Sequence, residues 1–490
     1  MCTRWVMLLV MLTAPAVAEA PQQVCRDDGS SLRLSQRWMG RENRVVCRPT
    51  SGDLRERRRP QPPIESISDN MWILGVLPPP GNGQVNDVWS PRSDLVIMGK
   101  FLDGWSVVDV SNPFLPTEIA STGAGLFIKD AKSEGDVVVV NNERDSIGAG
   151  AVLYDITNPL APVELARITS PLALSVHNVF LEDGFLYLSS NTSGRVEIFD
   201  ARVPSNPVHV ASVADDNGRI HDAAVINGRL YSSFLDGGFR VHDVSDPTAP
   251  VLLASQDYEG AVTHNAWPSA DGRFLFTTDE VAGGHLRVWD LGEVGGGQGP
   301  VRQIGRFVAS QPAIIHNVFV KDELVYASYY TAGLRIIDVS TPRLPVEVAI
   351  VDTFPGGGNV FDGVWGVFPA DEGGIVYLTD VVTGLWVLRF DGRIADAPTG
   401  LTGSAVLERS ALFARNVFEL SWSPHPQAVG YNIYRAQPDQ PFTRVADSPQ
   451  LSTRFLESGP AEAREYAVTA VLVDRTESRP TPILRLEASR

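Results

Sequence analysis

A short motif recurs along most of this chain: apolar residues, then an aspartate and a Ser-x-Pro turn. Its clearest copies are residues 336–342 (IIDVSTP) and 241–247 (VHDVSDP). Ahead of each copy the sequence holds an apolar run, a polar turn and a second run rich in aromatic and β-branched residues. Four short strands in each unit of about 44 residues are typical of a β-propeller blade, whereas helical repeats need long stretches with a 3.6-residue period.

Seven units can be traced, and each begins at a pair of residues that opens its first apolar run. The starting pairs are Asn86-Asp87, Lys129-Asp130, His177-Asn178, His221-Asp222, His264-Asn265, His316-Asn317 and Phe361-Asp362, at intervals of 43 to 52 residues. The last unit lacks its outer strand, and residues 71–77, ahead of the first unit, have the composition of one. We therefore predict an all-β chain in which residues 71–393 form a seven-bladed β-propeller, closed into a ring by residues 71–77.

The apolar-apolar-Asp-x-Ser-x-Pro element resembles the repeat of the LVIVD family of exported propeller proteins. The resemblance covers residues 71–393. It implies the propeller fold and a periplasmic or cell-surface location, and it implies no particular activity.

Residues 397–490 follow another pattern, in which polar and apolar residues alternate over several short runs. The clearest runs are residues 418–424 (FELSWSP), 430–435 (GYNIYR) and 466–471 (YAVTAV). Such runs predict a β-sandwich. They resemble a fibronectin type III domain, which implies core positions for Trp422 and Tyr466 and the role of a spacer or binding module.

The N-terminus combines a basic residue, a short apolar run and an Ala-x-Ala ending, which is typical of a secretory signal peptide. We predict a signal peptide at residues 1–18 and an exported mature protein, periplasmic, cell-surface or secreted, without a transmembrane segment. Residues 19–70 form an N-terminal arm in this interpretation. The arm holds Cys25 and Cys47, which we expect to form a disulfide in an oxidising compartment.

The second position of the starting pair is an acid or an amide in every unit. Its members are Asp87, Asp130, Asn178, Asp222, Asn265, Asn317 and Asp362. A residue type that every unit keeps is expected to serve every unit, and bonding the backbone at the channel entrance is such a task. We interpret this series as structural.

The first position is histidine in four consecutive units, so the blade itself does not require histidine there. If the position faces the channel, His177, His221, His264 and His316 converge near one of its ends. Imidazole is a common ligand for Zn, Cu and Fe, and one hypothesis is therefore a metal site. The alternative is that each histidine hydrogen-bonds the acid or amide of a neighbouring blade. His209, His242 and His285 occupy other positions and are expected at the surface.

The leading functional hypothesis is a binding or scaffold module of the cell envelope with a protein or carbohydrate partner. The net charge of −17 disfavours nucleic acid. The second hypothesis is a metal-dependent enzyme, an oxidoreductase or hydrolase, with Cu, Fe or Zn in the channel. No nucleophile elbow, phosphate loop or HExxH helix points to other chemistry.

Overall fold

The computed structural model describes residues 70–488, apart from 81–82, 145–149, 217, 298, 310–312, 355–357, 359, 410–413 and 461, together with three short strands upstream. These are β1 (Arg33–Leu34), β2 (Asn43–Arg44) and β3 (Glu65–Ser68). The predicted signal peptide and the Cys25–Cys47 disulfide lie outside the described residues.

The fold is all-β, as predicted, with 52% of the chain in strands and 1% in helices. The part of the chain that the structure describes contains no helix long and apolar enough to cross a membrane.

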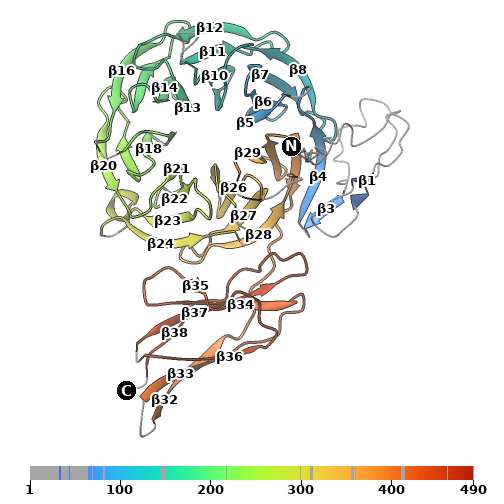
Figure 1. Ribbon diagram of the computed structural model, residues 1–490, viewed down its shortest axis with the longest axis vertical. Helices are drawn as coiled ribbons and strands as arrows, with labels where there is room; N and C mark the ends of the chain where they lie inside the picture. Colours follow the sequence, from blue (N-terminus) through green and yellow to red (C-terminus); the bar gives the residue numbers. More distant parts are fainter. Residues whose placement is uncertain are drawn as a thin grey trace, which may run out of the picture.

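Antiparallel sheets follow one another round a ring between Met71 and Phe390, and the first strand of each sheet lies toward the centre of the ring, which we call the channel (Figure 1). Six sheets have four strands each, in sequence order from the channel outward. They are β5 (Val85–Arg92), β6 (Leu95–Lys100), β7 (Trp105–Asp109), β8 (Thr117–Thr122); β9 (Ala131–Glu134), β10 (Val137–Asn141), β11 (Ala151–Asp155), β12 (Val163–Ile168); β13 (Val176–Glu182), β14 (Phe185–Ser190), β15 (Arg195–Asp200), β16 (Val208–Val213); β17 (Asp222–Ile226), β18 (Arg229–Ser233), β19 (Phe239–Asp243), β20 (Val251–Gln256); β21 (Thr263–Pro268), β22 (Phe274–Asp279), β23 (Leu286–Asp290), β24 (Arg302–Phe307); and β25 (Val318–Lys321), β26 (Leu324–Ser328), β27 (Leu334–Asp338), β28 (Val346–Val351). A 3-10 turn, η3 (Gly292–Gly295), precedes β24.

The last sheet of the ring joins the two ends of the repeat region. It consists of β29 (Val364–Pro369), β30 (Ile375–Asp380), β31 (Gly384–Phe390), β4 (Met71–Leu77) and β3. Residues 71–77 thus supply the outer strand that the last unit lacks, as predicted, because β4 runs antiparallel to β31. This pairing satisfies backbone groups that would otherwise form an open edge.

The recurring aspartate ends the third strand of a unit. Asp243 accepts a hydrogen bond from the N–H of Ser245 at 2.8 Å, and Asp338 accepts one from the N–H of Ser340 at 2.9 Å. The carboxylate therefore fixes the turn that leads to the outer strand. Between neighbouring sheets, apolar side chains of both faces pack into continuous clusters, such as Leu153 of one sheet against Val179 of the next.

Two further sheets lie beside the ring, next to β28 (Figure 1). One sheet contains β32 (Thr402–Arg409), β33 (Ala414–Ser421) and β36 (Arg454–Gly459); the other contains β35 (Thr443–Arg444), β34 (Gly430–Ala436), β37 (Arg464–Val471) and β38 (Leu484–Leu486). Trp422 and Tyr466 are buried in the core between them. An ion pair from Arg343 to Glu465 at 2.6 Å and another from Arg479 to Asp338 at 3.2 Å tie this C-terminal unit to the ring.

Candidate metal centre

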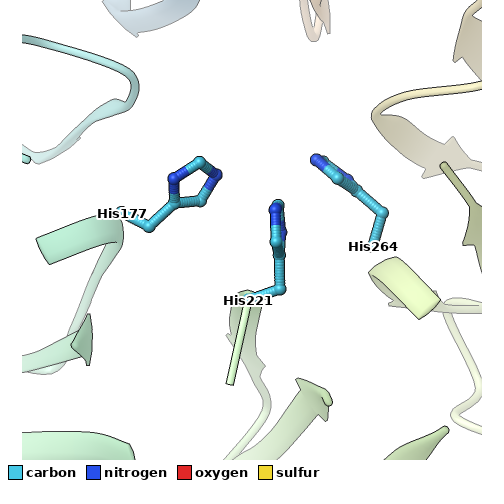
Figure 2. Close-up of side chains that lie close together, drawn as sticks. All are labelled: His177, His221 and His264. Atoms are coloured by element: carbon cyan, nitrogen blue, oxygen red, sulfur yellow. The ribbon is translucent and has the colours of Figure 1, made fainter. Parts of the chain in front are cut away.

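In the third and fifth sheets a bulge turns the first residue of the starting pair out of the strand pairing. In β13 the pairing with β14 steps from Val176 to Asn178 and skips His177. In β21 the pairing skips two residues, the first of which is His264. Bulges of this kind re-aim a side chain. Figure 2 shows the outcome, in which the imidazoles of His177, His221 and His264 point toward one another.

The register of the seventh sheet corrects the last starting pair. The pairing of β29 with β30 skips Trp365, so Trp365 and Gly366 hold the positions that were assigned to Phe361 and Asp362. Asp362 lies in the loop before β29 and takes no part in the structural series. A side chain at Gly366 is excluded, because a Cβ there would lie 2.9 Å from an oxygen of Asp87.

Five of the seven first-position side chains carry rings, and these rings form a continuous layer across the channel. Successive ring centroids are 4.2 Å apart for His177 and His221, 4.3 Å for His221 and His264, 4.3 Å for His264 and His316, and 4.5 Å for His316 and Trp365. Lys129 completes the layer, with its Nζ 4.8 Å from the centre of the Trp365 ring. We call these six side chains the imidazole layer.

Two of the imidazoles are oriented by acceptors at Nδ1. His177 Nδ1 lies 2.6 Å from a carboxylate oxygen of Glu143, and His316 Nδ1 lies 2.8 Å from the backbone oxygen of Trp365. Each acceptor favours the tautomer with the proton on Nδ1, which leaves the lone pair on Nε2. Carboxylate and carbonyl acceptors of this kind orient most metal-bound histidines.

The middle of the layer holds nitrogens that lack such acceptors. His264 is 2% exposed, and neither of its ring nitrogens has a hydrogen-bond partner among the described residues; His221 Nδ1 is also without one. Burial, and after it the neighbouring imidazoles, hold the pKa of His221, His264 and His316 well below the usual range. These rings are therefore neutral at pH 7, the form in which imidazole binds metals.

The ligand atoms of the layer fall into two sets that could each hold a metal ion. The first set is His177, His221 and His264, and the second is His264, Glu280 and His316. Within each set all ligand atoms lie within 4.8 Å of one another. Two ligands of one tetrahedral ion with bonds of about 2.1 Å are about 3.4 Å apart, so small side-chain rotations would close either set around an ion.

A cavity of about 10 Å³ separates the imidazole layer from the second-position residues below it, and it has room for about one water molecule. Its lining combines residues of both layers: Lys129, Asp130, His177, Asn178, Asp222, His264, His316, Asn317 and Trp365.

Comparison with known families matches two segments of the chain, residues 217–257 and 315–353, to the LVIVD repeat. The chain carries LVIVD repeats. The matched segments contain the fourth and sixth sheets of the ring, and with them His221 and His316. No curated protein matches the sequence.

Second-position residues of the first five units bond neighbouring sheets to one another. The N–H of Ala131 donates to Asp87 (3.3 Å), that of Val179 to Asp130 (2.8 Å), that of Ala223 to Asn178 (3.1 Å) and that of Val318 to Asn265 (3.3 Å). The side-chain amides of Asn178 and Asn265 donate in turn to Asp130 and Asp222, both at 3.0 Å. We call this series the acid-amide ladder. It links sheets and leaves the imidazoles free for another role.

Replacing Asp222 in the ladder with Asn is expected to stabilise the metal-free protein at pH 8 by about 2 kcal/mol. Burial, reinforced by the charge of Asp130, raises the pKa of Asp222 to about 7. The folded state thus holds a proton that the unfolded state loses near pH 4, so the wild type loses stability as pH rises from about 4 to 7. Asn keeps the acceptor for Asn265 and has no such loss. Urea unfolding with a chelator at pH 4, 6 and 8 measures the difference.

The stabilisation should shrink toward zero at pH 4, where Asp222 of the wild type is protonated in the folded state and about half-protonated in the unfolded state. The same substitution at the exposed Asp371 serves as a control and should leave stability within about 0.5 kcal/mol at every pH. An equal effect of D222N at pH 4 and pH 8 would contradict the titration.

The two carboxylates near the layer, Glu143 and Glu280, occupy the same position of their units, and the sequence assigned neither of them a role. In each unit, the second-position residue pairs with a residue on the second strand. The position in question comes two residues after that paired residue. The residues at this position are Phe101, Glu143, Asn191, Leu235, Glu280, Tyr330 and Val381. An alignment of the units on their second strands would have found both glutamates at one position above the histidines.

The remaining propeller histidines lie away from the channel. His209 is partly exposed and bonds Glu197 at 2.8 Å, and His285 is half-buried. The expectation of a surface position is wrong for His242, which is 7% exposed. Burial, with the adjacent Arg240, lowers the pKa of His242 to about 4.

Proposed function

We propose that this chain is an exported, metal-dependent propeller enzyme. In this proposal residues 71–393 are a seven-bladed β-propeller, and residues 397–490 are a fibronectin type III-like sandwich. The ring of antiparallel sheets, its closure by β4 and the matched LVIVD repeats support the first assignment. The two packed sheets around Trp422 and Tyr466 support the second.

The observation that carries the proposal is the state of His264. A buried polar atom without a partner costs about 1–3 kcal/mol, and His264 buries two of them at the meeting point of the layer. Hydrogen bonds to the ladder, the alternative role for these histidines, are absent for both nitrogens among the described residues. A metal ion bound by His177, His221 and His264 would satisfy one of these nitrogens.

The donor set favours Zn, Cu or Fe over hard cations, because all three ligands are imidazole nitrogens. Three histidines with a further coordination position left open are typical of catalytic rather than structural metal sites. The His177 side chain is 18% exposed, so the set can be reached from solvent. A bound ion would supply a Lewis acid that activates water, or a redox centre, according to the metal.

The chain's own residues prepare this site for a substrate. Glu143 holds His177 in the tautomer that presents Nε2, and it accepts a further hydrogen bond from Asn191 at 3.1 Å. Lys129 places a cation in the same layer, between the rings of Phe101 and Trp365. Burial lowers the pKa of Lys129, although Glu143 opposes the shift. An ammonium beside the proposed ion favours substrates that carry or develop negative charge.

The sequence favoured a binding or scaffold role, and this proposal assigns that role to the C-terminal unit. The C-terminal unit lies beside the ring, and it does not cover the centre of the ring when the ring is viewed face-on (Figure 1). A spacer or an adhesive module for a protein or carbohydrate of the cell envelope suits this placement.

Elemental analysis of protein purified without a histidine tag tests the metal proposal. We expect near-stoichiometric Zn, Cu or Fe in the wild type and at least 100-fold weaker binding at the three-histidine set in His221→Ala. His209→Ala, outside the channel, is the matched control and should retain the wild-type content. Wild-type protein that stays metal-free after incubation with each of the three ions would contradict the proposal.

A further inference from the structure

The second ligand set differs from the first in composition and in access to solvent. His264 Nε2 lies 3.7 Å from one carboxylate oxygen of Glu280, and His316 Nε2 lies 3.8 Å from the other. The side chains of both histidines are 3% exposed and that of Glu280 is 14% exposed. Two imidazoles and a carboxylate therefore form a nearly closed set beside the open one.

The surroundings hold this second set in place. Tyr330 donates its hydroxyl hydrogen to Glu280 at 2.7 Å, and the backbone oxygen of Trp365 accepts from His316 Nδ1. The Tyr330 ring is itself 1% exposed and lies 4.7 Å from the His316 ring. Such partners orient metal ligands, and each ligand of the second set except His264 has one.

His264 belongs to both sets, and neither of its ring nitrogens has a hydrogen-bond partner among the described residues. A single ion bound by His264 uses one nitrogen and leaves the other buried without a partner. His264 Nε2 faces Glu280, so two ions can be bound at once only when the three-histidine set takes Nδ1 of His264. Imidazole bridges two ions in this way after it loses its remaining N–H proton to solvent.

We propose that the channel holds a pair of divalent transition-metal ions bridged by the imidazole of His264. One ion is the proposed catalytic ion of the three-histidine set, on which this inference rests. The second ion is bound by His264, His316 and Glu280. The carboxylate of Glu280 and the bridging imidazolate offset the positive charge that a second ion brings into a buried site.

The different exposure of the two sets gives the two ions different roles. Closed sites are typical of structural ions, and open sites of catalytic ones. The ion at Glu280 therefore fixes His264 and with it the catalytic set. A chelator should accordingly remove one ion quickly and the other slowly.

Copper reconstitution tests the bridge on the full chain. Protein stripped with a chelator and loaded with Cu²⁺ is expected to retain two ions in the wild type after desalting. Either His316→Ala or the milder Glu280→Gln should retain one, His221→Ala one, and His264→Ala neither, while His209→Ala should retain two. Circular dichroism before loading confirms that each variant is folded.

Electron paramagnetic resonance separates a bridge from two independent ions. Magnetic coupling through the imidazolate should suppress the wild-type Cu²⁺ signal, whereas His316→Ala and His221→Ala should each give the full signal of one isolated ion. Two ions with an uncoupled wild-type signal would overturn the bridge. One ion that is lost in His221→Ala and kept in Glu280→Gln and His316→Ala would overturn the second site and leave the catalytic site intact. No bound ion would overturn both.

Discussion

Lys132→Met is expected to lower the free energy of unfolding by about 3–5 kcal/mol, the usual cost of removing one partner of a buried ion pair. Lys132 is 8% exposed, and its Nζ bonds Asp87 at 2.7 Å and also Asp130. Both carboxylates are rungs of the acid-amide ladder, so the variant leaves two buried negative charges facing each other beneath the imidazole layer. Urea unfolding of the metal-free protein, followed by far-UV circular dichroism, measures the loss.

The loss should depend on pH with a definite sign. Already in the wild type, burial raises the pKa of Asp87 well above its usual value, with Lys132 opposing and Asp130 reinforcing the shift. Without Lys132, which opposes the shift, the pKa of Asp87 in the folded state rises further above its unfolded value. The destabilisation is then largest at pH 8 and diminishes as pH falls toward 5.

A matched lysine provides the control for this prediction. Lys321 faces Asp371 at 3.4 Å, and the side chain of Asp371 is fully exposed. Exposed pairs contribute about 0–1 kcal/mol, so Lys321→Met should change stability by less than about 1 kcal/mol. If Lys132→Met costs no more than Lys321→Met, the cluster does not hold the inner strands together.

The sequence could predict the repeating sheets because the same local chemistry ends each unit. The aspartate that fixes the turn in residues 241–247 also does so in residues 336–342. The start of the seventh unit was misplaced because the glycine-rich sequence of residues 355–363 contains the pair Phe361-Asp362. That pair resembles a starting pair in sequence. The true starting pair, Trp365-Gly366, is defined only by how β29 pairs with β30.

The histidines of the site could be predicted as candidate ligands, whereas the sequence assigned no role to their carboxylate partners. Four histidines at one position of consecutive units stand out against a repeat that does not need them. Glu143 and Glu280 occupy a position where other units carry Asn191 or Leu235, so no common chemistry marks it. Ring closure alone brings residues such as Lys129 and Trp365 together, although they are 236 positions apart.

Zinc is expected to stabilise the metal-free wild type by about 2.7 kcal/mol for each occupied site at a concentration 100-fold above the dissociation constant, and so by about 5 kcal/mol for two sites. His264→Ala should abolish this stabilisation entirely, since the residue is a ligand in both sets. His316→Ala should keep about half, because His221 and His177 still bind one ion with His264. The shift of the urea midpoint with and without Zn²⁺ gives each value.

The same measurement distinguishes channel binding from adventitious binding to histidine elsewhere. His209→Ala removes a partly exposed imidazole that bonds Glu197, and it should leave the full zinc-dependent shift. Without metal, His264→Ala should lose only the stability expected from truncating a buried side chain of this size. It should lose no more, because the two ring nitrogens of His264 have no hydrogen-bond partner among the described residues. A zinc-dependent shift of wild-type size in His264→Ala would show that the ions bind outside the imidazole layer.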